Sequence, residues 1–275
     1  MALTVTFDLE DSRSSPSQEP RFVAMSDRFL EFVAARGIVA TVFIVGEIAR
    51  EHPELVRQVA AGGHEIGLHG LRHVALGDVG PKRLPEELRT GRELLEQAAE
   101  APVRGFRAPI FSLTPRTEWA ATQIAEAGFD YSSSVLPAAN PLHGWPGAPR
   151  EPCRWPVGLL EFPCPVAGVG RFLVPFLGGV YLRYVPGAFA RHALRSLGED
   201  AVAWSYLHPY DLDPDEPFSV MPHASWLTSR IVHTRRGATL GCLEGRLDAS
   251  GGAGPPLGDI ARRLAPAELP GIGSR

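Results

Sequence analysis

Two histidines and three nearby acids are the residues of this chain whose types and spacing could do chemistry. His69 and His73 are four residues apart, and the acids are Asp8, Glu10 and Asp11. On a helical turn, this spacing puts both rings on one face with Cβ atoms roughly 6 Å apart, so one metal ion could take a nitrogen from each. Two neutral imidazoles and one carboxylate suit Zn²⁺ or another divalent transition metal and leave a position open for water. The alternative is that one histidine caps the turn and the other is exposed to solvent.

The elements that must position these residues alternate between strand and helix patterns. Strands are predicted at 3–7, 40–45, 64–68, 103–106 and 129–131, and helices at 22–33, 53–61, 84–100 and 114–127. This alternation predicts an α/β fold with parallel βαβ units in a sheet or barrel. The second half, rich in Pro and Gly from 137 to 187, is predicted to hold short strands at 160–162 and 180–182, a helix at 187–197 and a strand at 201–207.

The domain organisation predicted from the sequence is simple. No internal repeat or clear linker interrupts the chain, so residues 1–248 are expected to form a single barrel domain. Residues 249–275 are rich in Gly, Pro and Ala and are expected to be a weakly ordered tail.

Polar residues follow several of the predicted strands. Asp8 follows the first strand, His69 the third, Arg107 the fourth and His208 the late strand. Because active sites in parallel α/β folds gather at the carboxyl ends of the strands, these side chains are expected to lie close together.

Composition and charge exclude some partners and environments. A formal net charge of −4 without a dense basic run argues against nucleic acid as the main partner. No stretch reaches the roughly 18 apolar residues of a membrane span, and the amino terminus lacks the features of a signal peptide. A cytoplasmic protein is therefore expected, with its three cysteines reduced. The sequence gives no indication of the oligomeric state.

Four segments in order resemble the main motifs of one enzyme family. They are residues 6–11 (TFDLED), 69–73 (HGLRH), 106–109 (FRAP) and 206–209 (YLHP). Together they resemble the polysaccharide deacetylases, the family four carbohydrate esterases, over residues 3 to about 245. The likeness is greatest to the subgroup associated with exopolysaccharide biosynthesis, through residues 8–11 (DLED), 107–112 (RAPIFS), 178–183 (GGVYLR) and 208–214 (HPYDLDP).

The resemblance implies a distorted (β/α) barrel with fewer than eight regular units. It also implies metal-dependent hydrolysis of the N-acetyl group of an amino sugar. In that chemistry Asp8 would be the general base, Arg107 would pair with and orient Asp8, and His208 would be the general acid. His69 and His73 would bind the metal, which is expected to be zinc.

Further roles follow from the same resemblance. Backbone N–H groups near Ile110 and Phe111, after Pro109, could complete an oxyanion pocket. Tyr210 could contact the sugar, although a packing role is equally open. Asp130 is a candidate for orienting His208, although a loop or capping role is about as open.

The sequence departs from the commoner family pattern in two places. Most members have adjacent aspartates in the first motif, and the second one binds the metal, whereas here Asp8 is followed by Leu-Glu-Asp. Strand alternation puts Glu10 on the face of Asp8, while a turn from Leu9 would bring Asp11 there instead. Glu10 is slightly preferred as ligand, with Asp11 as the alternative. The second departure is Ile110, where many members have an aromatic residue.

Two other functions remain open at this stage. The same fold could hydrolyse a cyclic amide or a small acylated metabolite, because bulk cell-wall polymer lies outside the cytoplasm. The altered acid motif could instead mark an inactive barrel that only binds carbohydrate.

Overall fold

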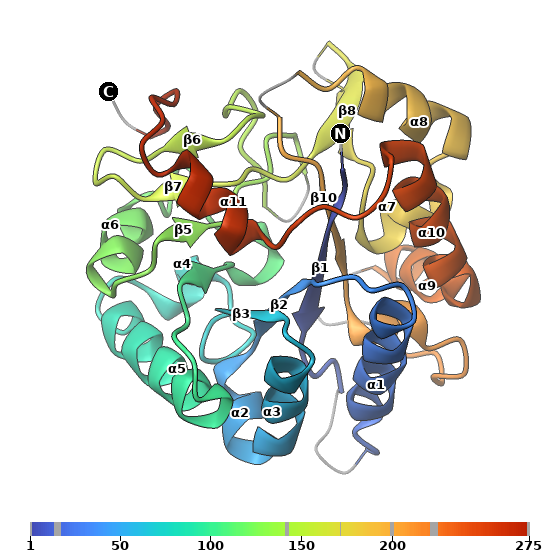
Figure 1. Ribbon diagram of the computed structural model, residues 1–275, viewed down its shortest axis with the longest axis horizontal. Coiled ribbons are helices and arrows are strands. Elements are labelled where there is room, and N and C mark those ends of the chain that lie inside the picture. The colour runs from blue at the N-terminus through green and yellow to red at the C-terminus, as the bar shows by residue number, and fades with distance from the viewer. Residues whose placement is uncertain are drawn as a thin grey trace.

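A curled sheet of eight strands forms the centre of the protein, and helices cover its outer side (Figure 1). The computed structural model describes residues 2–13, 18–140, 143–170, 172–198, 201–220 and 225–273. The strand order is β10-β1-β2-β3-β4-β5-β7-β6. The strands are β1 (Thr4–Leu9), β2 (Thr41–Ile44), β3 (Glu65–Leu68), β4 (Gly105–Phe106), β5 (Tyr131–Ser132), β6 (Cys153–Arg154), β7 (Leu160–Glu161) and β10 (Trp204–Leu207).

Neighbouring strands from β10 to β7 are parallel, and only β6 pairs antiparallel with its neighbour β7. The helices of the first half, which connect β1 to β5, are α1 (Arg21–Ala34), α2 (Gly46–Glu51), α3 (Pro53–Ala61), α4 (Leu76–Val79), α5 (Leu84–Ala99) and α6 (Trp119–Glu126). This arrangement confirms the predicted distorted (β/α) barrel with fewer than eight regular units.

The second half holds a separate hairpin and the remaining helices. The hairpin is β8 (Val166–Val169) with β9 (Phe172–Pro175), and the helices are α7 (Gly179–Tyr184), α8 (Gly187–Arg195), α9 (Trp226–His233), α10 (Thr239–Ser250) and α11 (Leu257–Leu264). The strand predicted at 180–182 is wrong, because these residues lie in α7. A run of three apolar residues is too short to separate a strand from one buried turn of helix. No helix among the described residues is long and apolar enough to cross a membrane.

Strand β1 is buried along its whole length, and apolar Val5, Phe7 and Leu9 alternate in it with polar residues at 4, 6 and 8. On one face Phe7 stacks on Phe29 of α1, with ring centroids 4.2 Å apart. On the opposite face lies Asp8, whose carboxylate meets Arg107 inside the curled sheet. The strand therefore packs its apolar side chains against the outer helices and carries an acid to its inner, carboxyl end.

The carboxyl-terminal segment is ordered, contrary to the expectation of a weakly ordered tail. Ala253 bridges to Leu3, and Leu257 on α11 is fully buried. The carboxylate of Glu65 accepts a hydrogen bond from the Gly258 N–H, 2.9 Å away, at the start of α11. The composition of this segment could not reveal its order, because the contacts that hold it come from residues about 200 positions earlier.

Replacing Leu257 should therefore cost stability. Leu257→Ala is expected to lower the free energy of unfolding by about 2–4 kcal/mol, because it removes a buried side chain from the core. Urea unfolding measures the change. Leu264→Ala is the matched control on the same helix, and it should cost clearly less because Leu264 is only partly buried. Equal, small effects would mean that α11 does not contribute to the core in solution.

Candidate active site and metal centre

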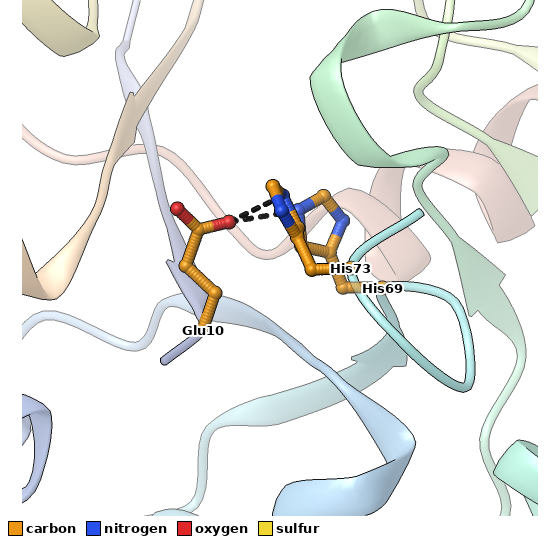
Figure 2. Close-up of side chains that lie close together, drawn as sticks. All are labelled: Glu10, His69 and His73. Atoms are coloured by element: carbon orange, nitrogen blue, oxygen red, sulfur yellow. Dashed lines mark ion pairs between the residues drawn. The ribbon is translucent and has the colours of Figure 1, made fainter. Parts of the chain in front are cut away.

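Glu10, His69 and His73 form a cluster at the carboxyl end of the sheet (Figure 2). One donor atom from each lies within 4.8 Å of the others. Glu10 Oε2 is 2.5 Å from His73 Nε2 and 3.7 Å from His69 Nε2. Glu10 and His69 are buried, while the side chain of His73 is 33% exposed. The cluster is thus buried at Glu10 and His69 and partly open to solvent at His73.

A loop, and not a helical turn, brings the two histidines together. His69 follows β3, and its N–H donates to the carbonyl of Ile44 on β2. Gly70 then turns the chain with φ of +75°, where a Cβ would come within 2.9 Å of the Arg72 carbonyl oxygen. This left-handed conformation favours glycine. A tight turn at Gly70 therefore brings the two histidines together, and the ring centroids of His69 and His73 are 5.2 Å apart.

The structure places Glu10, and not Asp11, beside the histidines. Asp11 turns away and forms an ion pair with Arg13 at 2.6 Å. Strand β1 stays extended through Leu9, so the alternation that directs Asp8 inward also directs Glu10 inward.

The cluster fits a divalent metal ion. Glu10 Oε2 is buried and makes no regular hydrogen bond within the described part of the chain. The His69 ring nitrogen Nδ1 lies 3.0 Å from the Arg107 carbonyl oxygen, a contact that fixes the ring and turns Nε2 toward Glu10. Burial alone would raise the pKa of Glu10, but His73 and His69 hold it well below its ordinary value. The donor set is therefore an anionic carboxylate with two imidazoles, which suits zinc.

Asp8 is held by a buried arginine. Arg107 Nη1 donates to Asp8 Oδ1 at 2.6 Å and to Thr6 Oγ1 at 2.7 Å, while Arg107 Nε donates to the Ser133 carbonyl. The guanidinium is fully buried and lies 4.1 Å from the centroid of the Phe43 ring. Because the arginine is buried and held by several hydrogen bonds, it fixes the Asp8 carboxyl group in one orientation.

His208 faces Asp8 from the neighbouring strand β10. Its Nε2 is 3.9 Å from Asp8 Oδ2, and its Nδ1 is 2.7 Å from Asp211 Oδ2. Burial alone would lower the pKa of His208, but Asp211 outweighs burial, with smaller contributions from Glu10 and Asp8, and raises it to about 9. Asp211 is itself anchored by buried Arg183. His208 is thus a protonated imidazole whose Nε2 points toward the candidate base.

The candidate Asp130 does not orient His208. It lies near the surface and pairs with Arg104 at 3.4 Å, at the amino-terminal end of β5. Asp211 takes that place, and the sequence carried a signal for it: the third residue after His208 is an acid, and Pro209 begins a short helical turn. In a capping box the third residue reaches back to the first, so an acid there contacts the histidine.

Asp211→Asn tests how the acid is tuned. A general acid must be protonated, so its activity is full below its pKa and is lost as the pH rises through it. Losing the Asp211 charge should move the alkaline limb of kcat/KM down by roughly two pH units, toward the ordinary histidine value of about 6.5. A pH profile of both proteins measures the shift. An unchanged alkaline limb would show that Asp211 does not set the protonation of His208.

The turn after Arg107 carries backbone strain. Ile110 and Phe111 both adopt left-handed conformations, with φ of 57° and 51°. Such strain costs on the order of 1–3 kcal/mol per residue and clusters at functional sites. The Phe111 N–H is one of the two predicted oxyanion donors, but it already donates a hydrogen bond to the Ala108 carbonyl. Pro109 lies against the position where Gly70 has no side chain.

Tyr210 lies against His208. Their rings stack with centroids 4.7 Å apart and an interplanar angle of 9°. The Arg236 guanidinium carbon is 5.5 Å from the centroid of the Tyr210 ring. The observed contacts of Tyr210 are thus with the candidate acid and an arginine, and they favour a supporting role for this side chain.

A cavity of about 760 Å³ lies at the opposite end of the sheet, beside the amino-terminal ends of β3, β5 and β7. The carboxylate of Glu65 at its wall accepts hydrogen bonds from Thr41 Oγ1, the Tyr131 hydroxyl and the Gly258 N–H. These bonds attach α11 to the sheet. The cavity is therefore distant from the strand ends that carry Asp8 and His208.

Comparisons with known proteins point to one family and its fold. Residues 2–131 match the family model of polysaccharide deacetylases, and residues 133–249 match a domain of unknown function, DUF3473. The boundary between the two matches falls at β5, so both contribute strands to one sheet. A chitooligosaccharide deacetylase from Sinorhizobium fredii is 33% identical over 81 residues, which are 29% of this chain and 38% of that protein. The chain thus spans well under half the length of the curated relatives it matches.

Solved structures share the whole fold. A crystal structure named as a polysaccharide deacetylase from Mycobacterium smegmatis superposes with a TM-score of 0.65 at 21% identity, over 100% of this chain and 93% of the other. A second one so named, from Pseudomonas aeruginosa, gives a TM-score of 0.62 at 17% identity, over 97% and 91% of the two chains. The chain therefore carries a domain of the polysaccharide deacetylase family at residues 2–131, which the DUF3473 region extends in the same sheet.

Proposed function

We propose that this protein is a metal-dependent hydrolase that removes N-acetyl groups from an amino-sugar oligosaccharide, polysaccharide or glycoconjugate. One observation carries the proposal: the Asp8 carboxyl group and the His208 imidazole face each other across 3.9 Å beside a cluster of one carboxylate and two imidazoles. Hydrolysis of an amide needs a base for the attacking water and an acid for the departing amine, and the two groups match these needs.

The roles of the side chains follow from their contacts. Asp8, fixed in orientation by Arg107, removes a proton from the attacking water. His208 Nε2 gives a proton to the amine nitrogen as its bond to the acetyl carbon breaks, so acetate and a free amine leave. Asp211 and Arg183 hold His208 in the orientation that presents Nε2.

Glu10, His69 and His73 would hold the metal ion, for which zinc suits the donor set best. When bound, the ion would polarise the acetyl carbonyl and favour ionisation of the water. Arg107 contributes to this arrangement twice, because its side chain orients Asp8 while its carbonyl oxygen orients His69.

The names of the curated relatives support a carbohydrate substrate. Chitooligosaccharide deacetylases and a peptidoglycan-N-acetylglucosamine deacetylase match between a quarter and a third of the chain. The resemblance of residues 8–11, 107–112, 178–183 and 208–214 to the exopolysaccharide-associated subgroup leads us to propose a substrate among biosynthetic amino-sugar polymers or their precursors.

Acetate release tests the proposal. Metal-replete protein is incubated with N-acetylglucosamine oligomers, lipid-linked N-acetyl sugars and nucleotide N-acetyl sugars, and acetate is measured enzymatically. A parallel series with cyclic amides separates deacetylation from ring opening. Acetate from an N-acetyl sugar without turnover of cyclic amides is expected. No acetate from any sugar class would contradict the proposal, and turnover of a cyclic amide alone would replace it with the alternative hydrolase.

A further inference from the structure

Two segments in the second half of the chain contain arginine but no acidic residue. Residues 162–198 and 217–243 hold seven arginines and none of the 31 Asp and Glu residues. They contribute α7, α8, α9 and the first part of α10, which lie on one side of the molecule (Figure 1, right). Arg183 and Arg236 form ion pairs with Asp211 and Glu216 from neighbouring segments, so the excess positive charge on this side comes from the other arginines, among them Arg230 and Arg235.

An apolar surface lies within this positive side. Helix α9 buries only Ser229, whereas Trp226 is 59% exposed, Leu227 is 62% exposed and Ile231 is 43% exposed. Tyr184 at the end of α7 continues the surface, because its hydroxyl donates to the Ile231 carbonyl. Exposed large apolar side chains that gather on one short helix mark an interaction surface.

Arginines lie among these apolar side chains. The guanidinium carbon of Arg230 is 5.5 Å from the centroid of the Trp226 ring, and that of Arg235 is 5.4 Å from the Tyr184 ring. We call the six residues the α9 patch: Tyr184, Trp226, Leu227, Arg230, Ile231 and Arg235.

The composition of the α9 patch fits one kind of partner. Aromatic rings with a polar edge occupy the boundary between lipid tails and headgroups, aliphatic side chains enter the acyl region, and arginines pair with anionic headgroups. A polysaccharide would offer hydroxyl groups that Leu227 and Ile231 cannot satisfy. We propose that the α9 patch docks this protein on the surface of an anionic lipid bilayer, without crossing it.

Docking at this place would bring the active site close to the bilayer. Arg183 Nη2 donates to the Val232 carbonyl on α9, and Arg183 Nη1 contacts Asp211, the partner of His208. Helix α9 is thus connected to the candidate acid through two buried side chains. The binding itself does not depend on the proposed deacetylation, and its test uses no substrate.

Vesicle flotation with the full chain tests the proposal. One set of vesicles is pure phosphatidylcholine, and in the other about a third of the lipid is phosphatidylglycerol. We expect about tenfold or stronger partition into the anionic vesicles, and loss of most of it at about 1 M salt, where the screening length is near 3 Å. Equal partition into both sets, or none into either, would overturn the proposal.

Variants with matched controls locate the contact. The double variant Trp226→Ser/Ile231→Ser should weaken partition about tenfold or more, since it removes two apolar side chains from the docking surface. Val39→Ser/Val157→Ser is the control, because these valines are 42% and 44% exposed but lie outside the positive segments. Arg230→Ala should weaken binding about fivefold, and Arg89→Ala on α5, with a 60% exposed side chain, should not. Equal effects of test and control variants would contradict docking through α9.

Quenching of tryptophan fluorescence by brominated lipids provides a second measurement, which locates Trp226 in the bilayer without a variant that loses binding. Trp226 is far more exposed than Trp155 and Trp204, which are 3% and 0% exposed. Brominated lipids should therefore quench the fluorescence of the native protein, and Trp226→Phe should remove most of this quenching while the protein still floats with the vesicles. Quenching that persists in Trp226→Phe, or binding of an anionic polysaccharide that releases the protein from vesicles, would overturn the proposed docking mode.

Discussion

Glu10→Gln is expected to lose bound metal and hydrolytic activity together. The substitution keeps the size of the side chain but removes the only carboxylate that lies within reach of both His69 and His73 in the described chain. Two imidazoles and water hold a divalent ion weakly, so metal affinity should fall by about 100-fold or more. Metal content after dialysis, measured by mass spectrometry of the element, checks the affinity, and acetate release checks the activity.

Asp11→Asn is the matched control for this experiment. It removes a charge one residue away, from a carboxylate that pairs with Arg13 and lies outside the cluster. The variant should therefore keep its metal and most of its activity. Loss of metal in Asp11→Asn with retention in Glu10→Gln would contradict the ligand set and point to rearrangement of the strand end on metal binding. Loss in both variants would show that the two carboxylates share the ion.

The choice between these two acids illustrates what the sequence could predict. Alternation along a strand depends only on local geometry, so the preference for Glu10 followed from the pattern that began at Thr4. The expectation that Asp8, His69, Arg107 and His208 lie close together is also confirmed. It depends only on the direction of parallel strands, whose carboxyl ends meet at one edge of the sheet, and not on details of packing.

Other features depended on contacts that a sequence pattern does not carry. The spacing of His69 and His73 fits a helical turn as well as a loop. The structure has a loop there, in which Gly70 lies close to Arg72 and Pro109. The position of Arg183 on α7 could not be read from its apolar neighbours, since its partners Asp211 and Val232 lie 28 and 49 residues away. Long-range polar contacts of this kind set the geometry of the candidate acid.

Asp8→Asn should separate chemistry from metal binding. The amide has the shape of the carboxylate and can still accept the hydrogen bond from Arg107, but it cannot take a proton from water. We expect normal metal content and a fall in turnover of about 10²- to 10⁴-fold, the range of a lost general base. Metal analysis and initial rates of acetate release on the same protein sample measure both quantities.

Stability must be followed in the same variant, because Arg107 is fully buried and loses its counter-charge. An unpaired buried charge can cost about 3–5 kcal/mol, so thermal unfolding shows whether lost activity merely reflects lost folding. Asp130→Asn serves as the control, since it also breaks an arginine pair, but at the surface. Folded Asp8→Asn with full metal and little turnover would support a general base at this position. Full turnover in that folded variant would remove Asp8 from the chemistry and leave it only a structural role beside Arg107.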